Sequence, residues 1–93
     1  MTVKIATKSI TAENQFSDRA VIRGYFNFSL SGTWVATVTV QRSFDDGATW
    51  LDVKTFVGNT EEYGFEPETG VLYMFGVKTG AFTSGTVVGR LSQ

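Results

Sequence analysis

One polar stretch between two alternating runs constrains this chain more than any other feature. Residues 34–41 alternate between two faces, residues 51–57 do the same, and the segment between them contains Asp46-Gly47. Glycine adopts positive φ angles without a Cβ penalty, and aspartate tolerates the left-handed region. The pattern therefore predicts a β-hairpin whose two flanks are antiparallel neighbours.

The loop of this hairpin has the pattern Ser-x-Asp-x-Gly-x-Thr-Trp, at Ser43, Asp45, Gly47, Thr49 and Trp50. The pattern resembles the Asp-box, a hairpin motif known from sialidase propellers and from many unrelated β proteins. We expect the Asp45 carboxylate to accept backbone N–H groups of the loop, and the Trp50 indole to fold back over the turn. The resemblance implies a structural role for these five residues and no activity.

The size and composition indicate one globular domain that spans residues 1–93 and has a single core. Apolar residues make up 42% of the chain, and it contains neither His nor Cys. The chain has eight Lys and Arg residues and nine Asp and Glu residues, and the basic residues form no cluster. This charge balance argues against a nucleic-acid partner. No apolar run approaches the roughly 20 residues that span a bilayer, and no secretory segment follows Met1. We therefore expect a soluble protein with no membrane partner.

The chain predicts an all-β fold, because short alternating runs are separated by turn signals and no stretch has helical periodicity. We expect a single antiparallel β-sandwich of about seven short strands, with Ig-like or jelly-roll-like wiring. Residues 1–18 are read as an N-terminal strand or arm followed by a loop. The expected strands are 2–9, 19–30, 34–42, 50–57, 71–77 and 86–91, and residues 61–65 are a short strand or an irregular segment. The expected turns or loops are 31–33, 58–60, 66–70 and 78–85.

Alternation also predicts which side chains face the core. Within 19–30, one face carries Phe26, Phe28 and Leu30, and Gly24 is the expected site of a bulge. Residues 34–42 are the most strand-like run, so we expect a central strand there. Residues 71–77 are apolar on both faces, which is typical of a strand covered on both sides. In the run after the Asp-box, we expect the core-facing residues to be Leu51, Val53 and Val57, with Asp52 and Lys54 facing water.

Carboxylates are the only side chains suited to catalysis, and they lie on turns of a domain too small for a substrate cleft. Solvated charge is their ordinary role, so we predict no enzyme and no cofactor. Asp45 and Asp46 offer oxygen ligands of the kind that calcium prefers. A brace of the turn is the favoured role of Asp45, and we predict no metal site.

The aromatic residues leave a carbohydrate-binding module open as an alternative function. Exposed rings stack on flat apolar faces, including those of sugars. The candidates are Tyr25, Tyr63 and Phe82. A small sandwich also needs aromatic residues for its core, and a neutral domain rich in β structure more often binds protein.

Longer stretches suggest a family. From Phe26 the chain reads Phe-x-Phe-Ser-Leu-Ser-Gly-Thr-Trp, from Val38 it reads Val-Thr-Val-Gln-Arg-Ser-Phe-Asp-Asp-Gly-Ala-Thr-Trp, from Glu68 it reads Glu-x-Gly-Val-Leu-Tyr, and it ends Thr-Ser-Gly-Thr-Val-Val-Gly-Arg-Leu-Ser-Gln. These stretches resemble small tailed-bacteriophage structural proteins. The resemblance implies a virion component, such as a capsid decoration protein or a head or tail accessory protein, that binds a major capsid or tail protein. It brings no catalytic or cofactor residues.

The N-terminal segment is the expected contact between copies. Val3 and Ile5 give residues 1–9 a strand pattern, while the polar residues 11–18 separate that strand from the body. A strand with an unpaired edge readily adds to the sheet of a neighbour. We therefore expect a homo-oligomer or a repeating lattice, with threefold symmetry if the protein decorates threefold sites of a capsid.

Overall fold

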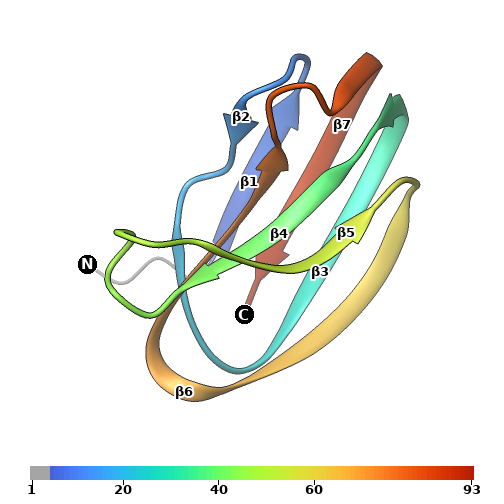
Figure 1. Ribbon diagram of the computed structural model, residues 1–93. Coiled ribbons are helices and arrows are strands. Elements are labelled where there is room, and N and C mark those ends of the chain that lie inside the picture. The colour runs from blue at the N-terminus through green and yellow to red at the C-terminus, as the bar shows by residue number, and fades with distance from the viewer. Residues whose placement is uncertain (1–4) are drawn as a thin grey trace.

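The computed structural model describes residues 5–93, which form one antiparallel sheet of seven strands and contain no helix (Figure 1). The all-β prediction is confirmed. The strand order is β1-β7-β3-β6-β4-β5, and β2 pairs with β6 outside this path. The strands are β1 (Ile5–Ile10), β2 (Gln15–Phe16), β3 (Ala20–Ala36), β4 (Val38–Ser43), β5 (Leu51–Phe56), β6 (Thr60–Val77) and β7 (Phe82–Ser92).

The sheet folds into two facing layers because its two longest strands, β3 and β6, bend and pass from one layer to the other (Figure 1). The first half of β6, residues 60–66, pairs with β3, and β3 also pairs with β7. The second half of β6, residues 71–77, pairs with β4 and β2. The two layers enclose the core, as expected for a β-sandwich.

The bend in β3 is a bulge at Gly24. This residue has φ +87, and the ladder shifts its register between Ile22 and Gly24. Opposite the shift, residues 67–70 of β6 have no partner in the ladder. The predicted bulge is confirmed. The loop expected at 66–70 is instead an insertion inside one strand, since the chain on both sides of it pairs with β3.

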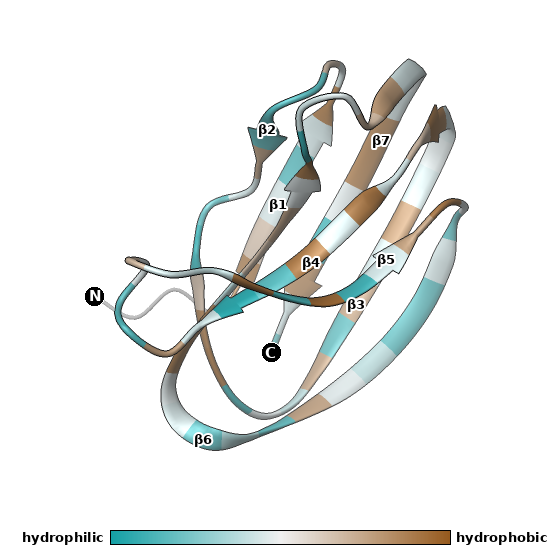
Figure 2. Ribbon diagram, viewed as in Figure 1, coloured by the Kyte–Doolittle hydropathy of each residue, from teal (hydrophilic) through white to brown (hydrophobic). Residues whose placement is uncertain are grey.

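The core fills the space between the layers. Phe26, Phe28 and Leu30 of β3 are buried, as their alternation predicted, and the ring of Phe28 lies 5.3 Å from that of Phe75 on β6. Residues 71–77 bury side chains of both faces, which confirms a strand covered on both sides. Figure 2 shows the resulting bands of apolar and hydrophilic residues along β4 and β6.

The two Ser-Gly-Thr segments, residues 31–33 and 84–86, correct the turn predicted at 31–33 and the second half of the turn predicted at 78–85. Residues 78–81 do turn, and there the Ala81 N–H donates to the Lys78 carbonyl oxygen at 3.0 Å. Both segments lie inside paired strands and meet at their ends: Thr33 is opposite Thr86, and the flanking pairs are Gly32 with Val87 and Trp34 with Gly85. Gly32 has φ +100 and Gly85 has φ +91. A Cβ atom would lie 2.4 Å from the Thr86 carbonyl oxygen at Gly32 and 2.2 Å from that of Thr33 at Gly85. The glycines let the two backbones approach without turning the chain.

The single central strand expected at 34–42 is also wrong. β3 ends at Ala36 and β4 begins at Val38, so the alternating run is divided between two strands that are not neighbours in the sheet. At the division, the Thr37 N–H donates to the Ala81 carbonyl oxygen at 2.9 Å. Alternation continues through this point, and it therefore gives no sign of where the chain changes partners.

The orientation predicted for the run after the Asp-box is wrong for its three apolar residues. The exposed fractions are 48% for Leu51, 46% for Val53 and 78% for Val57, while Asp52 and Lys54 are exposed as expected. Among the described residues, β5 pairs only with β4, and a register shift leaves Val53 outside the ladder. β5 is thus an edge strand that extends beyond the cover of the other layer.

The N-terminal strand belongs to the sheet. β1 pairs with β7 from Ile5, opposite Ser92, to Ile10, opposite Val87. Ile10 is fully buried in the core, and Ile5 is half exposed at the edge. From Ile5 onward the segment is a strand of this domain rather than a detached arm, because its main-chain hydrogen bonds go to β7. Val3 lies outside the described residues.

Candidate binding sites

The Asp-box loop is held by its own side chains. Asp46 has φ 59 and Gly47 has φ 91, so the predicted positive φ angles are confirmed. Asp45 Oδ1 accepts from the Ser43 hydroxyl at 2.7 Å and from the Thr49 N–H at 2.8 Å. The Gly47 N–H donates to Ser43 Oγ at 2.8 Å. The hydrogen bond from Ser43, followed by those from Thr49, lowers the pKa of Asp45.

Arg19 fastens this loop to the start of β3. Its guanidinium carbon lies 5.7 Å from the centre of the Trp50 ring, and Nη1 donates to the Asp46 carbonyl oxygen at 3.4 Å. Sequence reasoning missed Arg19, since a residue that far from the loop in sequence gives no local signal. With Asp45 Oδ1 engaged by Ser43 and Thr49, and Arg19 against Trp50, the loop is braced by side chains.

The acids considered for catalysis are dispersed. Glu66 is almost fully buried, and its carboxylate accepts from the Tyr73 hydroxyl at 2.7 Å and from Arg42 Nη1 at 2.8 Å. Its other oxygen accepts from the Glu68 N–H at 3.1 Å. Burial by itself raises the pKa of Glu66. The three hydrogen bonds together lower it by more than burial raises it, so the net shift of the pKa is downward. Burial and the neighbouring Glu66 raise the pKa of Tyr73 to about 12. This network holds the insertion in β6.

No metal site is evident in the described part of the chain, because no three His, Cys, Asp or Glu side chains gather in residues 5–93. Over the same residues, the structure contains no helix long and apolar enough to cross a membrane.

Three exposed aromatic rings form what we call the aromatic face, on the outside of β3 and β6. Their exposed fractions are 71% for Tyr25, 76% for Tyr63 and 56% for Phe65. The Tyr25 ring centre lies 4.9 Å from that of Phe65 and 6.3 Å from that of Tyr63. The structure therefore brings together two of the predicted residues. Phe82 is instead half-buried against the core. Phe65 was missed, although its position two residues after Tyr63 places both on one face of a strand.

A polar hollow of about 350 Å³ lies beside Tyr63. Cross-strand pairing builds it, because Asn27 is opposite Tyr63 and Ser29 lies between Glu61 and Arg90. Glu62 completes the lining. Within residues 5–93, the side chains of Asn27, Glu61 and Arg90 have no hydrogen-bond or ion-pair partner. The hollow thus presents both donors and acceptors to a ligand.

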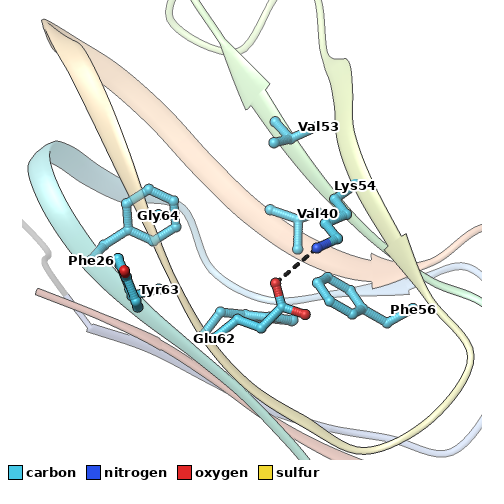
Figure 3. Close-up of a pocket in the computed structure, with 9 residues that line it drawn as sticks. Phe26, Val40, Val53, Lys54, Phe56, Glu62, Tyr63 and Gly64 are labelled. Atoms are coloured by element: carbon cyan, nitrogen blue, oxygen red, sulfur yellow. Dashed lines mark hydrogen bonds and ion pairs between the residues drawn. The ribbon is translucent and has the colours of Figure 1, made fainter.

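A second site, which we call the open edge, lies where β5 faces the first half of β6. Among the described residues, each of these segments pairs on one side only. Between them is a pocket of about 90 Å³, lined mainly by apolar residues (Figure 3). At this pocket, Lys54 Nζ donates a hydrogen bond to Glu62 Oε1 at 2.9 Å, and this hydrogen bond lowers the pKa of Glu62. The lining residues are Phe26, Phe28, Val40, Val53, Lys54, Phe56, Glu62, Tyr63 and Gly64.

The inner wall of this pocket depends on Gly64, which has no side chain. A Cβ atom on Gly64 would lie 2.7 Å from the Phe26 ring, so the absence of a side chain lets that ring pack against the strand. Phe28 and Phe56 approach from the two layers, with ring centres 5.2 Å apart. The hydrophobic core therefore reaches the surface between two strand edges.

No protein family, curated protein or solved structure matches this chain.

Proposed function

We propose that this protein is a non-enzymatic structural component of tailed-bacteriophage virions that binds other virion proteins through its open edge. The observation that carries the proposal is the set of exposed apolar residues, Leu51, Val53 and Val57, on and just after β5, whose outer edge has no strand partner among the described residues. An apolar surface beside free main-chain N–H and C=O groups favours a strand of a partner protein. The resemblance to small phage structural proteins names the partner class, a major capsid or tail protein.

The pocket at the open edge fits this kind of partner. Its volume of about 90 Å³ is smaller than the roughly 150 Å³ cavity that holds benzene. It therefore has room for one apolar side chain of an added strand, while alternate side chains of that strand lie outside it. Copies bound to a repeating lattice would lie next to one another, which is the setting we propose for self-association.

Gradient-purified particles test the proposal. We expect mass spectrometry to detect the chain at structural copy number, and Val53→Asp to abolish its incorporation because a charge would enter the apolar interface. Val35→Asp is the matched control, since Val35 is also exposed but does not line this pocket. Both variants must first give the thermal melt of the wild type. Particles that lack the wild-type chain, or that accept the Val53 variant at full copy number, would contradict the proposal.

A further inference from the structure

We infer that the aromatic face and the polar hollow beside it form a binding site for neutral pyranose sugars. This surface adjoins the open edge and shares Glu62 and Tyr63 with its pocket, but it lies on the outer face of the sheet and its ligand belongs to a different class. The inference therefore does not rest on the virion proposal.

The aromatic face supplies the apolar half of such a site. Tyr25, Tyr63 and Phe65 are each more than half exposed, and the Tyr25 ring lies next to both of the other rings. Their tilted arrangement, with interplanar angles of 56° and 55°, presents ring surface in more than one direction. The C–H face of a pyranose is a flat apolar surface of the kind that stacks on such rings.

The hollow supplies the polar half. A sugar hydroxyl both donates and accepts, so it needs donors and acceptors close together. Arg90 offers donors, Glu61 offers acceptors, and Asn27 offers both, and none of them has another partner within residues 5–93. The volume of about 350 Å³ lies within the usual range for small-ligand sites.

The charge of the hollow selects a neutral ligand. Arg90 and Glu61 carry opposite charges, and the charge of Glu62 is already balanced by Lys54 at 2.9 Å. A sialic acid or a phosphate would meet as many negative as positive charges here, which removes the usual attraction for an anion. The side chains that would contact the sugar lie on paired strands, β3, β6 and β7, so the backbone of the site needs little ordering on binding.

The test starts with the full chain on an array of neutral and acidic glycans. We expect hits among neutral hexose oligosaccharides. The strongest is then titrated by calorimetry against the wild type and three variants, Tyr25→Ala, Arg90→Ala and Val35→Ala. Neither Tyr25 nor Arg90 lines the open-edge pocket, and Val35 is the distant control. Loss of one stacking or hydrogen-bonding group should weaken binding by about tenfold, while the control should bind as the wild type does.

Amide chemical-shift mapping on the wild type provides a readout that needs no variant. The shifts caused by the strongest glycan should centre on Tyr25, Tyr63 and Arg90. An array without hits, hits confined to acidic glycans, or shifts centred elsewhere would each overturn the inference. Glycan binding that survives in Val53→Asp, the variant expected to be lost from virions, would separate this site from the open edge.

Discussion

The Asp-box loop and the paired Ser-Gly-Thr segments use glycine in the same backbone region but for different reasons. In the loop, Gly47 has φ +91 and the contacts that hold the turn come from Ser43 and Asp45, a few residues away. In the paired segments, Gly32 and Gly85 have similar φ angles, but each faces the backbone of the other strand. The first glycine completes a local turn, whereas the other two permit a long-range pairing.

The range of these contacts explains why the Asp-box could be predicted from its pattern and the pairing of the Ser-Gly-Thr segments could not. The hydrogen bonds of the Asp-box join residues at most four apart, so the local sequence contains the whole motif. Ser-Gly-Thr contains nothing that distinguishes a turn from a strand. Whether this tripeptide forms a turn or a strand depends on a partner about fifty residues away, since Thr33 pairs with Thr86.

The largest effect is expected where a side chain would meet backbone. Gly85→Ala combines a positive φ with a Cβ atom 2.2 Å from the Thr33 carbonyl oxygen. We expect it to lower the free energy of unfolding by about 2–5 kcal/mol, measured by urea denaturation. The matched control is Gly80→Ala, because Gly80 has φ +84 but no atom within 4 Å of the added Cβ; its cost should be about 1–2 kcal/mol. Equal costs for the two would show that the strands separate freely.

The local motif is tested by Ser43→Ala. Ser43 is fully buried, and its hydroxyl oxygen accepts from the Gly47 N–H while the hydroxyl donates to Asp45. Removal leaves these groups without their partner, and we expect a loss of about 1–3 kcal/mol. Thermal melts provide the measurement, with Ser31→Ala as an exposed control. A melt within a degree of the wild type would mean that the loop does not depend on its internal hydrogen bonds.

Gly47→Ala should cost less than Gly85→Ala, although the two glycines have the same φ of +91. The Cβ atom at Gly47 would lie 2.5 Å from Arg19 Nη1, which is the end of a flexible side chain that can move aside. We expect about 1–2 kcal/mol, mainly from the backbone conformation. In the background Arg19→Ala, the cost should fall only slightly. A cost as large as that of Gly85→Ala would show that Arg19 is held rigidly against Trp50.

The smallest effect is expected for the pH dependence of stability. It concerns Glu66, at the insertion in β6, which makes hydrogen bonds both to a near neighbour and to distant residues. Its carboxylate accepts from Glu68 nearby and from Arg42 and Tyr73 at a distance, and its pKa is lowered in the fold. A carboxyl with a lowered folded pKa stabilises the protein fully above its unfolded pKa, about 4.3, and this contribution is lost as pH falls through the folded pKa.

Between pH 7 and pH 4 the loss should therefore be small, and it should steepen at lower pH. Urea denaturation across this range gives the slope of stability against pH for the wild type and for Glu66→Gln. We expect a shallower slope in the variant, because the titrating group is gone. The contribution of Asp45, whose pKa is also lowered, stays in both proteins. Identical slopes would show that Glu66 titrates alike in the folded and unfolded chains.

Local sequence patterns were enough for the features that depend on near neighbours. The Asp-box pattern predicted the positive φ angles of Asp46 and Gly47, and alternation predicted the buried face of Phe26 and Phe28. Both follow from local rules, because turn geometry involves adjacent residues and side chains of a strand alternate with period two. The same alternation implied an all-β fold.

Which strands are neighbours and which lie at an edge depends instead on the assembled sheet. Residues 51–57 alternate like a core strand, yet Val53 is exposed because no strand lies beyond β5 among the described residues. Tyr25 and Tyr63 become one surface only because β3 and β6 pair in a particular register. Pairing depends on the free energy of the whole sheet, summed over contacts far apart in sequence, and no short pattern contains it.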